Sequence, residues 1–331
     1  SDVCSSDLLD RLVRHCLLVA GTALITAPAI AQEYPTKPVR IIVPYPGGSG
    51  PDIVARTLAG VMTRQLGQNV LVENKGGGGG VPAILDLKNA PQDGHTILLP
   101  DSSQWAVFPS LRTDLPYEPA RDFAPIGMLY SNGLYFYVKS DSPLKSITDV
   151  VARAKEKPGS LRYGVTGVGG IMHIAGEAWR LAAGINVTVV PYRASAEALA
   201  SVLSGDLDFA LTGLSSIKAV IQGGKIKTLA STGPKRDRYT PDVPSVNEIP
   251  GIRGFDYQAD IGLVAWTGTP RPIIDKLSRT LHAAQKDAVL LDFLKSLDYD
   301  AVVTTPEEFG ALIRRDTEQN AKLVKLTGLK S

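Results

Sequence analysis

The most constraining feature of this chain is the stretch at residues 41–56, which reads IIVPYPGGSGPDIVAR. It begins as an apolar run with β-branched residues, which is typical of a strand buried on both faces of a parallel sheet. Pro and Gly then interrupt the run, and Pro51 suits a first helical turn because its missing N–H would have no partner there. Apolar residues recur at helical spacing as far as Leu66. The stretch therefore predicts a strand, a glycine loop and a helix.

Two further loops of small residues follow predicted strands in the same way. The strand at 70–74 leads into five consecutive glycines at 76–80, and the strand at 96–99 leads into Asp101, Ser102, Ser103 and Gln104. A glycine run is either a flexible connector or a place where backbone must approach another group closely. In open α/β sheets, ligands bind outside the carboxyl ends of the strands. Free amides at loops and helix starts favour an anion there.

The βα pattern then restarts. Strand-like runs lie at 123–129, 134–138, 162–165, 187–192, 208–211, 227–230 and 261–265. Helices are predicted at 146–157, 171–183, 196–203, 272–286 and 305–326, and capping-box patterns at Ser146 and Thr305 mark the starts of the first and the last. After the strand at 162–165, residues 166–170 read TGVGG and precede a helix. This repeats the strand, glycine loop and helix predicted for residues 41–56. Two such strand–loop–helix units on separate parts of the fold would place two helix N-termini on facing walls of one cleft.

The first 31 residues have the pattern of a secretory signal. Arg11 and Arg14 precede an apolar run at 17–25, and Ala29 and Ala31 supply the small residues that a signal peptidase requires. We expect cleavage before Gln32 and export to the periplasm. Both cysteines lie ahead of that point, at positions 4 and 16, so disulfides and thiolate catalysis are not expected in the exported chain. Residues 1–9 are atypical of a signal start.

Charge and histidine content exclude several classes of protein. The net charge is +2 and 6% of residues are aromatic, so no basic stripe with interleaved aromatics suggests nucleic-acid binding. His95, His173 and His282 are too widely spaced to predict a metal site. His173 follows the second glycine loop by three residues, so it either lines the cleft or packs in the first helical turn.

Two enzyme classes are alternatives to a binding protein. The Gly-x-Ser-x-Gly pattern of hydrolases fails because Pro51 takes its last position, and no serine pairs convincingly with a histidine. Residues 78–83 formally match the dinucleotide pattern Gly-x-Gly-x-x-Ala. Pro82 falls inside that match, however, and an exported location argues against a soluble nicotinamide enzyme. We therefore expect no cofactor and no catalytic residue.

Taken together, an ordered set of motifs resembles one family, the solute receptors of tripartite tricarboxylate transporters, also called Bug receptors. The resemblance runs from about Tyr34 to Leu329. Its motifs are VPY at 43–45 with the following glycine loop, VENK at 72–75, DGHT at 93–96, DFAPIG at 122–127, KPGSLRYG at 157–164, HIAGE at 173–177, VPYR at 190–193, PDVPSV at 241–246, GTP at 268–270 and TPEEF at 305–309.

The resemblance implies a two-lobed, Venus-flytrap periplasmic binding protein of the α/β class, type II-like, in which each lobe is a mostly parallel sheet flanked by helices. The first lobe would comprise residues 32–133 and 258–331, and the second residues 134–257. A small carboxylate would bind between the lobes and pass to membrane subunits of a tripartite tricarboxylate transporter. We expect a monomer without enzymatic activity. An exported α/β hydrolase, or a receptor that signals through a sensor without transport, stays an alternative.

The resemblance also implies which residues hold the ligand, mainly through backbone N–H groups and small hydroxyls. The expected ligand-binding residues are Tyr45, Ser49, Gly50, Gly78, Gly79 and Ser103 from the first lobe, with Thr166, Gly169, Gly170, His173 and Asp208 from the second. The helix-start chemistry of the glycine loops predicts the same anion site independently.

One departure from the family bears on the ligand. Many members carry an aromatic residue just before the returning strand, where this chain has Asp260. If that acid faces the cleft, it disfavours a second carboxylate on the ligand and accepts a hydroxyl, amide or amine group instead. Asp260 is therefore the twelfth expected site residue.

Overall fold

The computed structural model describes residues 33–166 and 169–329. The chain divides into two units, residues 1–36 and residues 37–331, and the fold below belongs to the second. The expected signal peptide lies outside the described residues. No helix within the described ranges is long and apolar enough to cross a membrane.

The sheet begins with three parallel strands that the apolar runs predict. They are β1 (Val39–Val43), β2 (Val70–Asn74) and β3 (Thr96–Leu98), and β1 lies between the other two. Ile41, Ile42 and Val43 are fully buried, as expected for a strand covered on both faces. The remaining strands are β4 (Phe123–Lys139), β5 (Arg162–Thr166), β6 (Thr188–Tyr192), β7 (Phe209–Gly213), β8 (Ile226–Ser231), β9 (Gln258–Trp266) and β10 (Asp300–Ala301).

Strand β4 joins two sets of strands. From Phe123 to Gly133 it pairs antiparallel with β9, and from Leu134 onward it pairs antiparallel with β7 and β8. The strand order is β2-β1-β3-β9-β4-β7-β5-β6, with β8 and β10 pairing to β4 outside that path. Residues 123–129 and 134–138 were predicted as two runs. They form one strand because β9 provides hydrogen-bond partners across the turn-like Ser-Asn-Gly at 131–133.

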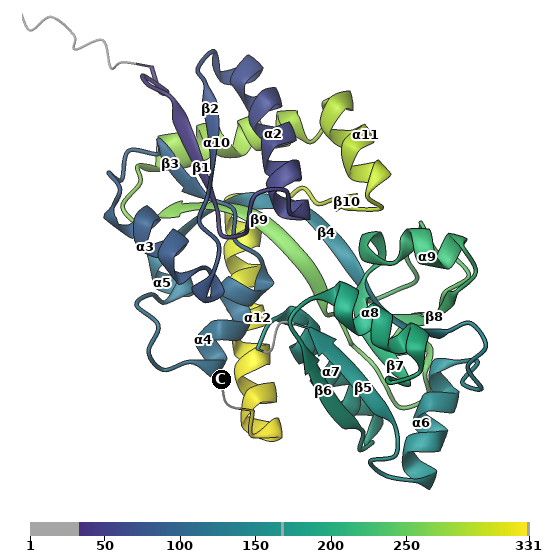
Figure 1. Cartoon of the computed structure of the whole chain (residues 1–331). Coiled ribbons are helices and arrows are strands. Elements are labelled where there is room, and N and C mark those ends of the chain that lie inside the picture. The colour runs from purple at the N-terminus through teal and green to yellow at the C-terminus, as the bar shows by residue number, and fades with distance from the viewer. Residues whose placement is uncertain (1–32, 167–168, 330–331) are drawn as a thin grey trace, which may run out of the picture. The chain divides into compact units, whose positions relative to one another are not determined.

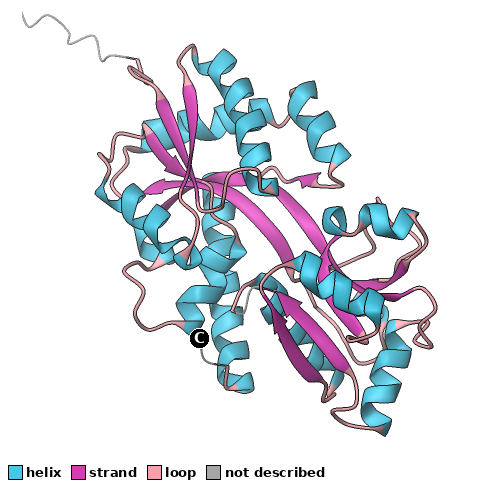
Figure 2. Cartoon of the chain, viewed as in Figure 1, coloured by secondary structure: helices cyan, strands magenta, loops and turns pink. Residues whose placement is uncertain are grey.

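Helices flank both sets of strands (Figures 1 and 2). The longer helices are α2 (Gly50–Leu66), α3 (Val81–Asn89), α6 (Ile147–Glu156), α7 (Ile171–Ala183), α8 (Ser195–Ser204), α10 (Arg271–Ala284), α11 (Ala288–Ser296) and α12 (Pro306–Thr327). Shorter elements are α4 (Phe108–Leu111), α5 (Pro119–Asp122), α9 (Lys218–Gln222), the π-turn η2 (Ser103–Val107) and three 3₁₀ turns, η1 (Gly78–Gly80), η3 (Leu214–Ser216) and η4 (Val246–Glu248).

Helix α12 packs on the face of β9 that includes Gly262, where a Cβ would lie 2.5 Å from the Phe309 ring. Helix α2 packs against both α10 and α11, as can be followed in Figure 1. Capping boxes fix the starts of α6 and α12, as the sequence predicts: Ser146 pairs with Asp149, and Thr305 with Glu308.

The second set of strands has its own core. Phe136, Trp179 and Phe209 are fully buried, and the Phe136 and Trp179 ring centroids lie 4.6 Å apart. Strand β5 runs parallel to both β6 and β7, so its carboxyl end at Thr166 faces the same way as that of β7 at Gly213. The predicted α/β class, with parallel strands alternating with helices, is confirmed.

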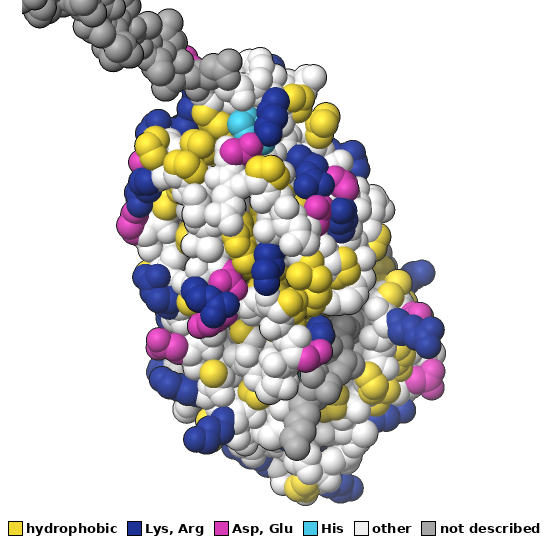
Figure 3. Space-filling model, turned by 90° about the vertical axis from the view of Figure 1, so that its left-hand side faces the viewer, with side chains coloured by type: hydrophobic (Ala, Val, Ile, Leu, Met, Phe, Trp, Pro, Cys, Tyr) yellow, Lys and Arg dark blue, Asp and Glu magenta, His cyan; other side chains and the backbone are white. Residues whose placement is uncertain are grey.

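Surface charge is dispersed on the face shown in Figure 3, where Lys and Arg side chains are scattered among Asp and Glu. No continuous basic region crosses that face. This distribution agrees with the small net charge of +2.

Candidate functional site

The first glycine loop connects β1 to α2, and Ser49 is the N-cap residue of that helix, with φ −70° and ψ 161°. Its side chain makes no capping bond, and its buried Oγ has no hydrogen-bond partner among the described residues. Pro51 in the first turn has no N–H to satisfy. A buried hydroxyl without a partner is costly unless another group binds it, so Ser49 presents a hydrogen-bonding group for a ligand.

Asp52 holds this loop in place. It is 2% exposed, and its carboxylate accepts hydrogen bonds from the Gly48 N–H at 2.7 Å and the Asn74 side chain at 2.9 Å. Its carboxylate also pairs with Arg56 at 3.0 Å. Burial alone would raise the pKa of Asp52, but these hydrogen bonds and the Arg56 charge hold it below 3.8. Asp52 is therefore an anionic anchor that ties the first loop to β2.

The second glycine loop contains four residues with positive φ, from Gly77 to Gly80. A Cβ at Gly76 would lie 3.0 Å from the Pro46 nitrogen, and one at Gly79 would lie 3.1 Å from the Phe108 ring. The five glycines are thus required by backbone conformation and by close approach to the first loop and to α4. The interpretation of the run as a flexible connector is not supported.

The third loop centres on Asp101, just after β3. The Tyr45 hydroxyl donates to its Oδ2, and the Ser103 N–H donates to its Oδ1 at 2.8 Å. Burial raises the pKa of Asp101, and burial together with the Asp101 charge raises the pKa of Tyr45 well above 10. Tyr45 is thereby committed to Asp101. The sequence analysis named Asp101 only as part of a polar loop. Its position shortly after a strand is the feature of the sequence that could have indicated its role in this loop.

The fourth loop leads from Thr166 into α7, with Gly170 as the N-cap residue and residues 167–168 outside the description. Gly169 has φ +82°, and its N–H donates to His173 Nδ1 at 3.1 Å. Burial lowers the pKa of His173. The neutral imidazole that accepts at Nδ1 carries its proton on Nε2, so that nitrogen is a donor. Thr166 is buried, and its hydroxyl donates to the sulfur of Met172 at 3.0 Å.

Direct contacts join the fourth loop to the others. The N–H of Ile171, the first residue of α7, donates to Ser103 Oγ at 3.1 Å. The Phe108 ring lies 3.1 Å from a Cβ position on Gly79 and 4.0 Å from one on Gly169. The structure thus brings Gly79, Ser103 and Gly169 into one neighbourhood, and the Tyr45–Asp101–Ser103 contacts extend it to the end of β1.

Asp208 is not part of that neighbourhood. It precedes β7 and accepts a hydrogen bond from the Arg162 N–H at 2.6 Å, with the Arg162 guanidinium 3.2 Å away. Arg162 is the first residue of β5, whereas Thr166 is its last. Asp208 therefore lies at the amino ends of the parallel strands, and the structure does not bring it together with the fourth loop, which follows the carboxyl end of β5. The sequence predicted Asp208 as the first residue of the strand at 208–211, and only the resemblance suggested a place for it in the site.

Asp260 lies on β9, on the side of the strand that faces α12. Ser131 donates to its Oδ1 at 2.5 Å, and the two residues are paired across β4 and β9. Burial, reinforced by the nearby charges of Asp256 and Asp316, raises the pKa of Asp260 to about 7, against the opposing effects of Ser131 and Arg315. The cavity beside it has a volume of about 20 Å³, which is room for about one water molecule. Asp260 thus lines a small polar cavity and not a ligand-sized one.

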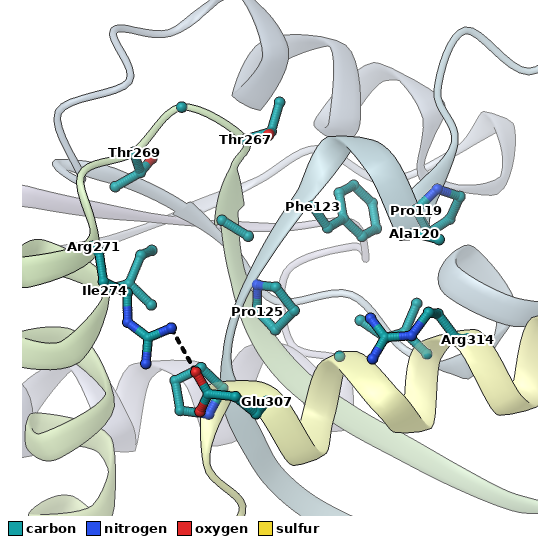
Figure 4. A pocket seen from close by; sticks show the side chains of 15 residues that line it. Pro119, Ala120, Phe123, Pro125, Thr267, Thr269, Arg271, Ile274, Glu307 and Arg314 are labelled. Carbon is teal, nitrogen blue, oxygen red and sulfur yellow. Dashed lines mark ion pairs between the residues drawn. The ribbon is translucent and has the colours of Figure 1, made fainter.

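Two larger pockets contain none of the twelve predicted residues. One, of about 420 Å³, lies among β4, β9, α10 and α12, and its polar side includes an Arg271–Glu307 ion pair of 2.5 Å (Figure 4). The other, of about 820 Å³, lies between residues 231–241 and the α11–β10 region. Neither pocket is lined by the glycine loops, whose amides are the groups predicted to favour an anion.

Comparison with known proteins shows which family this chain resembles. Residues 54–329 match the model of the tripartite tricarboxylate transporter family receptors. A protein from the tcbD–tcbE intergenic region of Pseudomonas sp. strain P51 is 30% identical over 96% of this chain and 95% of its own length. The solved periplasmic binding protein BugD has a TM-score of 0.75 and 32% identity, and covers 90% of this chain and 99% of its own.

A third similar protein was solved with a ligand. Rpa4515 of R. palustris, with adipate, has a TM-score of 0.78 and 25% identity, covering 90% of this chain and 99% of its own. These likenesses confirm the predicted fold class, that of the periplasmic solute-binding proteins. The chain belongs to the tripartite tricarboxylate transporter receptor family, whose Bug proteins include BugD.

Proposed function

We propose that this chain is a periplasmic, non-enzymatic receptor that binds a small carboxylate between two lobes and delivers it to the membrane subunits of a tripartite tricarboxylate-type transporter. The observation that carries the proposal is the buried, unpartnered Ser49 hydroxyl at the start of α2. A helix N-terminus with a free hydroxyl suits a carboxylate, because both the amides and the helix dipole favour negative charge. The solved relative with adipate supports a carboxylate as the ligand class.

The proposed site combines four loops. Ser49 and Gly50 would hold one carboxylate oxygen, and Gly78 and Gly79 would approach it by backbone. Ser103 Oγ accepts from the Ile171 N–H, and its hydroxyl hydrogen-bonds to the Asp101 carboxylate, so Ser103 would support the site by joining the third and fourth loops. Thr166, Gly169, Gly170 and His173 would form the opposite wall. Tyr45 acts indirectly, since its hydroxyl is bound to Asp101.

The strand pairing supports the predicted division into lobes. Strand β4 exchanges β9 for β7 and β8 as its partners between Gly133 and Leu134, and β9 begins at Gln258. These are the predicted positions at which the chain passes from one lobe to the other. Closure would be a population shift, because a ligand held by both walls binds the closed arrangement more tightly.

The hydrolase alternative lacks support from the site. His173 Nδ1 accepts from a backbone amide and does not contact a serine hydroxyl within the described residues. The same residues contain no group of three acidic, histidine or cysteine side chains suited to a metal. A receptor that serves a sensor instead of a transporter would bind its ligand in the same way.

The proposal is tested by comparing two N-cap serines. Ser49→Ala should leave stability nearly unchanged but weaken carboxylate binding about tenfold or more, because a hydrogen bond to a charged group is lost. Ser146→Ala is the matched control, because its hydroxyl caps α6 through the Asp149 N–H. It should cost about 1 kcal/mol of stability and leave binding unchanged.

The measurement is calorimetric titration with adipate and with other mono-, di- and tricarboxylates. Equal affinity of parent and Ser49→Ala for every acid that binds would remove Ser49 and the α2 start from the site.

A further inference from the structure

A three-residue segment, Asp298-Tyr299-Asp300, links α11 to β10 and has an unusual backbone. Asp298 has φ +58°, and among the described residues it is the one non-glycine residue with positive φ. Asp and Asn tolerate this left-handed conformation better than most residues, but it still costs energy and persists only where neighbouring contacts enforce it. The contacts of this segment must therefore hold Asp298 in its left-handed conformation.

Each residue of the segment contacts the predicted second lobe. Asp298 pairs with Lys218 at 2.6 Å, and its side chain is only 9% exposed. Asp300 pairs with Arg238 at 2.5 Å. The carbonyl of Tyr299 accepts a hydrogen bond from the Tyr239 hydroxyl, and the Tyr299 hydroxyl lies 3.2 Å from Ser215 Oγ. All four partners belong to residues 134–257.

The same segment is fixed firmly to the first lobe. The Tyr299 ring stacks on Tyr130 with centroids 4.8 Å apart and planes 10° from parallel. The Tyr299 N–H donates to the Leu294 carbonyl. Asp300 of β10 lies opposite Ser131 of β4 in the antiparallel strand pairing. The Tyr299 hydroxyl lies 3.4 Å from a Cβ position on Gly50, the first residue of α2. The segment thus bridges the proposed ligand loop and the second lobe.

We propose that Asp298, Tyr299 and Asp300 form a clasp that holds the two lobes in the closed arrangement before any ligand binds, with Tyr299 positioning the start of α2. The inference rests on the proposed two-lobed receptor. An ion pair of this kind changes an equilibrium by about 1.4- to 5-fold. Independent contacts multiply, so the clasp would shift the closed-to-open ratio by roughly tenfold or more.

The clasp also has a consequence for affinity. When the binding-competent arrangement is only partly populated, the apparent dissociation constant rises in inverse proportion to that population. A receptor that is already biased toward closure spends less ligand-binding free energy on the conformational change. Loss of the clasp would therefore weaken binding without removing a ligand contact.

The test measures the separation of the lobes without ligand. In full-length protein with Cys4 and Cys16 replaced by serine, Leu71→Cys and Leu181→Cys introduce two exposed label sites, on β2 and α7. Spin labels there report a distance distribution by double electron–electron resonance. We expect one narrow population in this labelled background, and a second population when Lys218→Ala and Arg238→Ala are added. A distribution unchanged by the two substitutions, or already broad in the background, would overturn the clasp.

Two further variants separate the clasp from general damage. Tyr299→Phe removes only the hydroxyl that meets Ser215, and it should produce a smaller second population. Arg153→Ala removes an exposed ion pair with Glu156 inside the predicted second lobe and should leave the distribution unchanged. No ligand is present in this experiment, so a failure of carboxylate binding would refute the proposed function while leaving the clasp result to stand on its own.

Discussion

Asp260 is a buried residue whose shifted pKa makes the stability of the chain depend on pH. Burial raises the pKa of its carboxyl from an ordinary 3.8 to about 7. Between those values the folded chain keeps the proton and the unfolded chain releases it. The free energy of unfolding contributed by Asp260 therefore falls as pH rises through this window, and the whole penalty is present above pH 7.

Asp260→Asn should remove that penalty, because an amide stays neutral and its oxygen still accepts from Ser131. The variant should be more stable than the parent at pH 8, by at most about 4 kcal/mol, and the advantage should vanish near pH 4. Urea unfolding across this range measures the effect. Asp292→Asn, an exposed substitution on α11, is the control and should follow the parent at every pH. An Asp260→Asn curve that runs parallel to the parent would contradict the assignment.

Gly79 is the residue at which backbone conformation and close approach coincide. It has φ +67°, and a Cβ there would lie 3.1 Å from Phe108. Gly79→Ala should cost about 1–2 kcal/mol for the backbone conformation, plus a further loss for displacing the ring. Gly67→Ala, after α2, is the matched control, because its φ of 65° and ψ of 15° are close to those of Gly79 but a Cβ there meets nothing within 4 Å. Equal losses of unfolding free energy in the two variants would show that the Phe108 contact is unimportant.

Among the elements, the start of α2 has an acidic residue, Asp52, that should contribute more to stability than the acidic residue at an ordinary helix start. Asp52 and Asp149 are both the third residue of their helix, in α2 and α6. Asp149 accepts only from the local backbone at 145 and 146, whereas Asp52 also binds Asn74 of β2 and pairs with Arg56. We expect Asp52→Ala to cost roughly 2–3 kcal/mol and Asp149→Ala roughly 1 kcal/mol in urea unfolding. A larger loss from Asp149→Ala would contradict this ranking.

Most elements could be predicted from the sequence, because their signals are local. Apolar runs located β1 and β5, and the Ser146 and Thr305 capping boxes located the starts of α6 and α12. Long-range pairing could not be predicted in the same way. The continuity of β4 through residues 131–133 depends on β9, more than a hundred residues away, and β10 depends on β4.

The candidate site shows the same limit. The glycine loops were found because glycine runs and helix starts are visible locally in the sequence. Asp208 was named from the resemblance, and the structure places it beside Arg162 at the start of β5. Asp101 and Tyr299 were missed as important residues. Their roles come from partners distant in sequence, Tyr45 for the first and Ser215 and Tyr239 for the second.

For the whole molecule, the proposal joins two lobes, four loops and a clasp into one receptor. The family establishes the fold and the receptor class. The Ser49 hydroxyl and the glycine loops support the proposed anion site, and the Asp298–Asp300 segment contacts residues of the predicted second lobe. Breaking the clasp should therefore weaken closure of the lobes, whereas removing the Ser49 hydroxyl should remove a contact with the ligand.

The most direct test of the central claim is calorimetric titration of the chain with adipate and other carboxylates, alongside the amide and alcohol analogues of each. The anion site predicts saturable 1:1 binding of at least one acid and loss of binding when its carboxylate becomes an amide. A bound acid at a hundred times its dissociation constant should also add about 2.7 kcal/mol to the free energy of unfolding. Binding of neutral or cationic compounds with no response to any acid would contradict the claim.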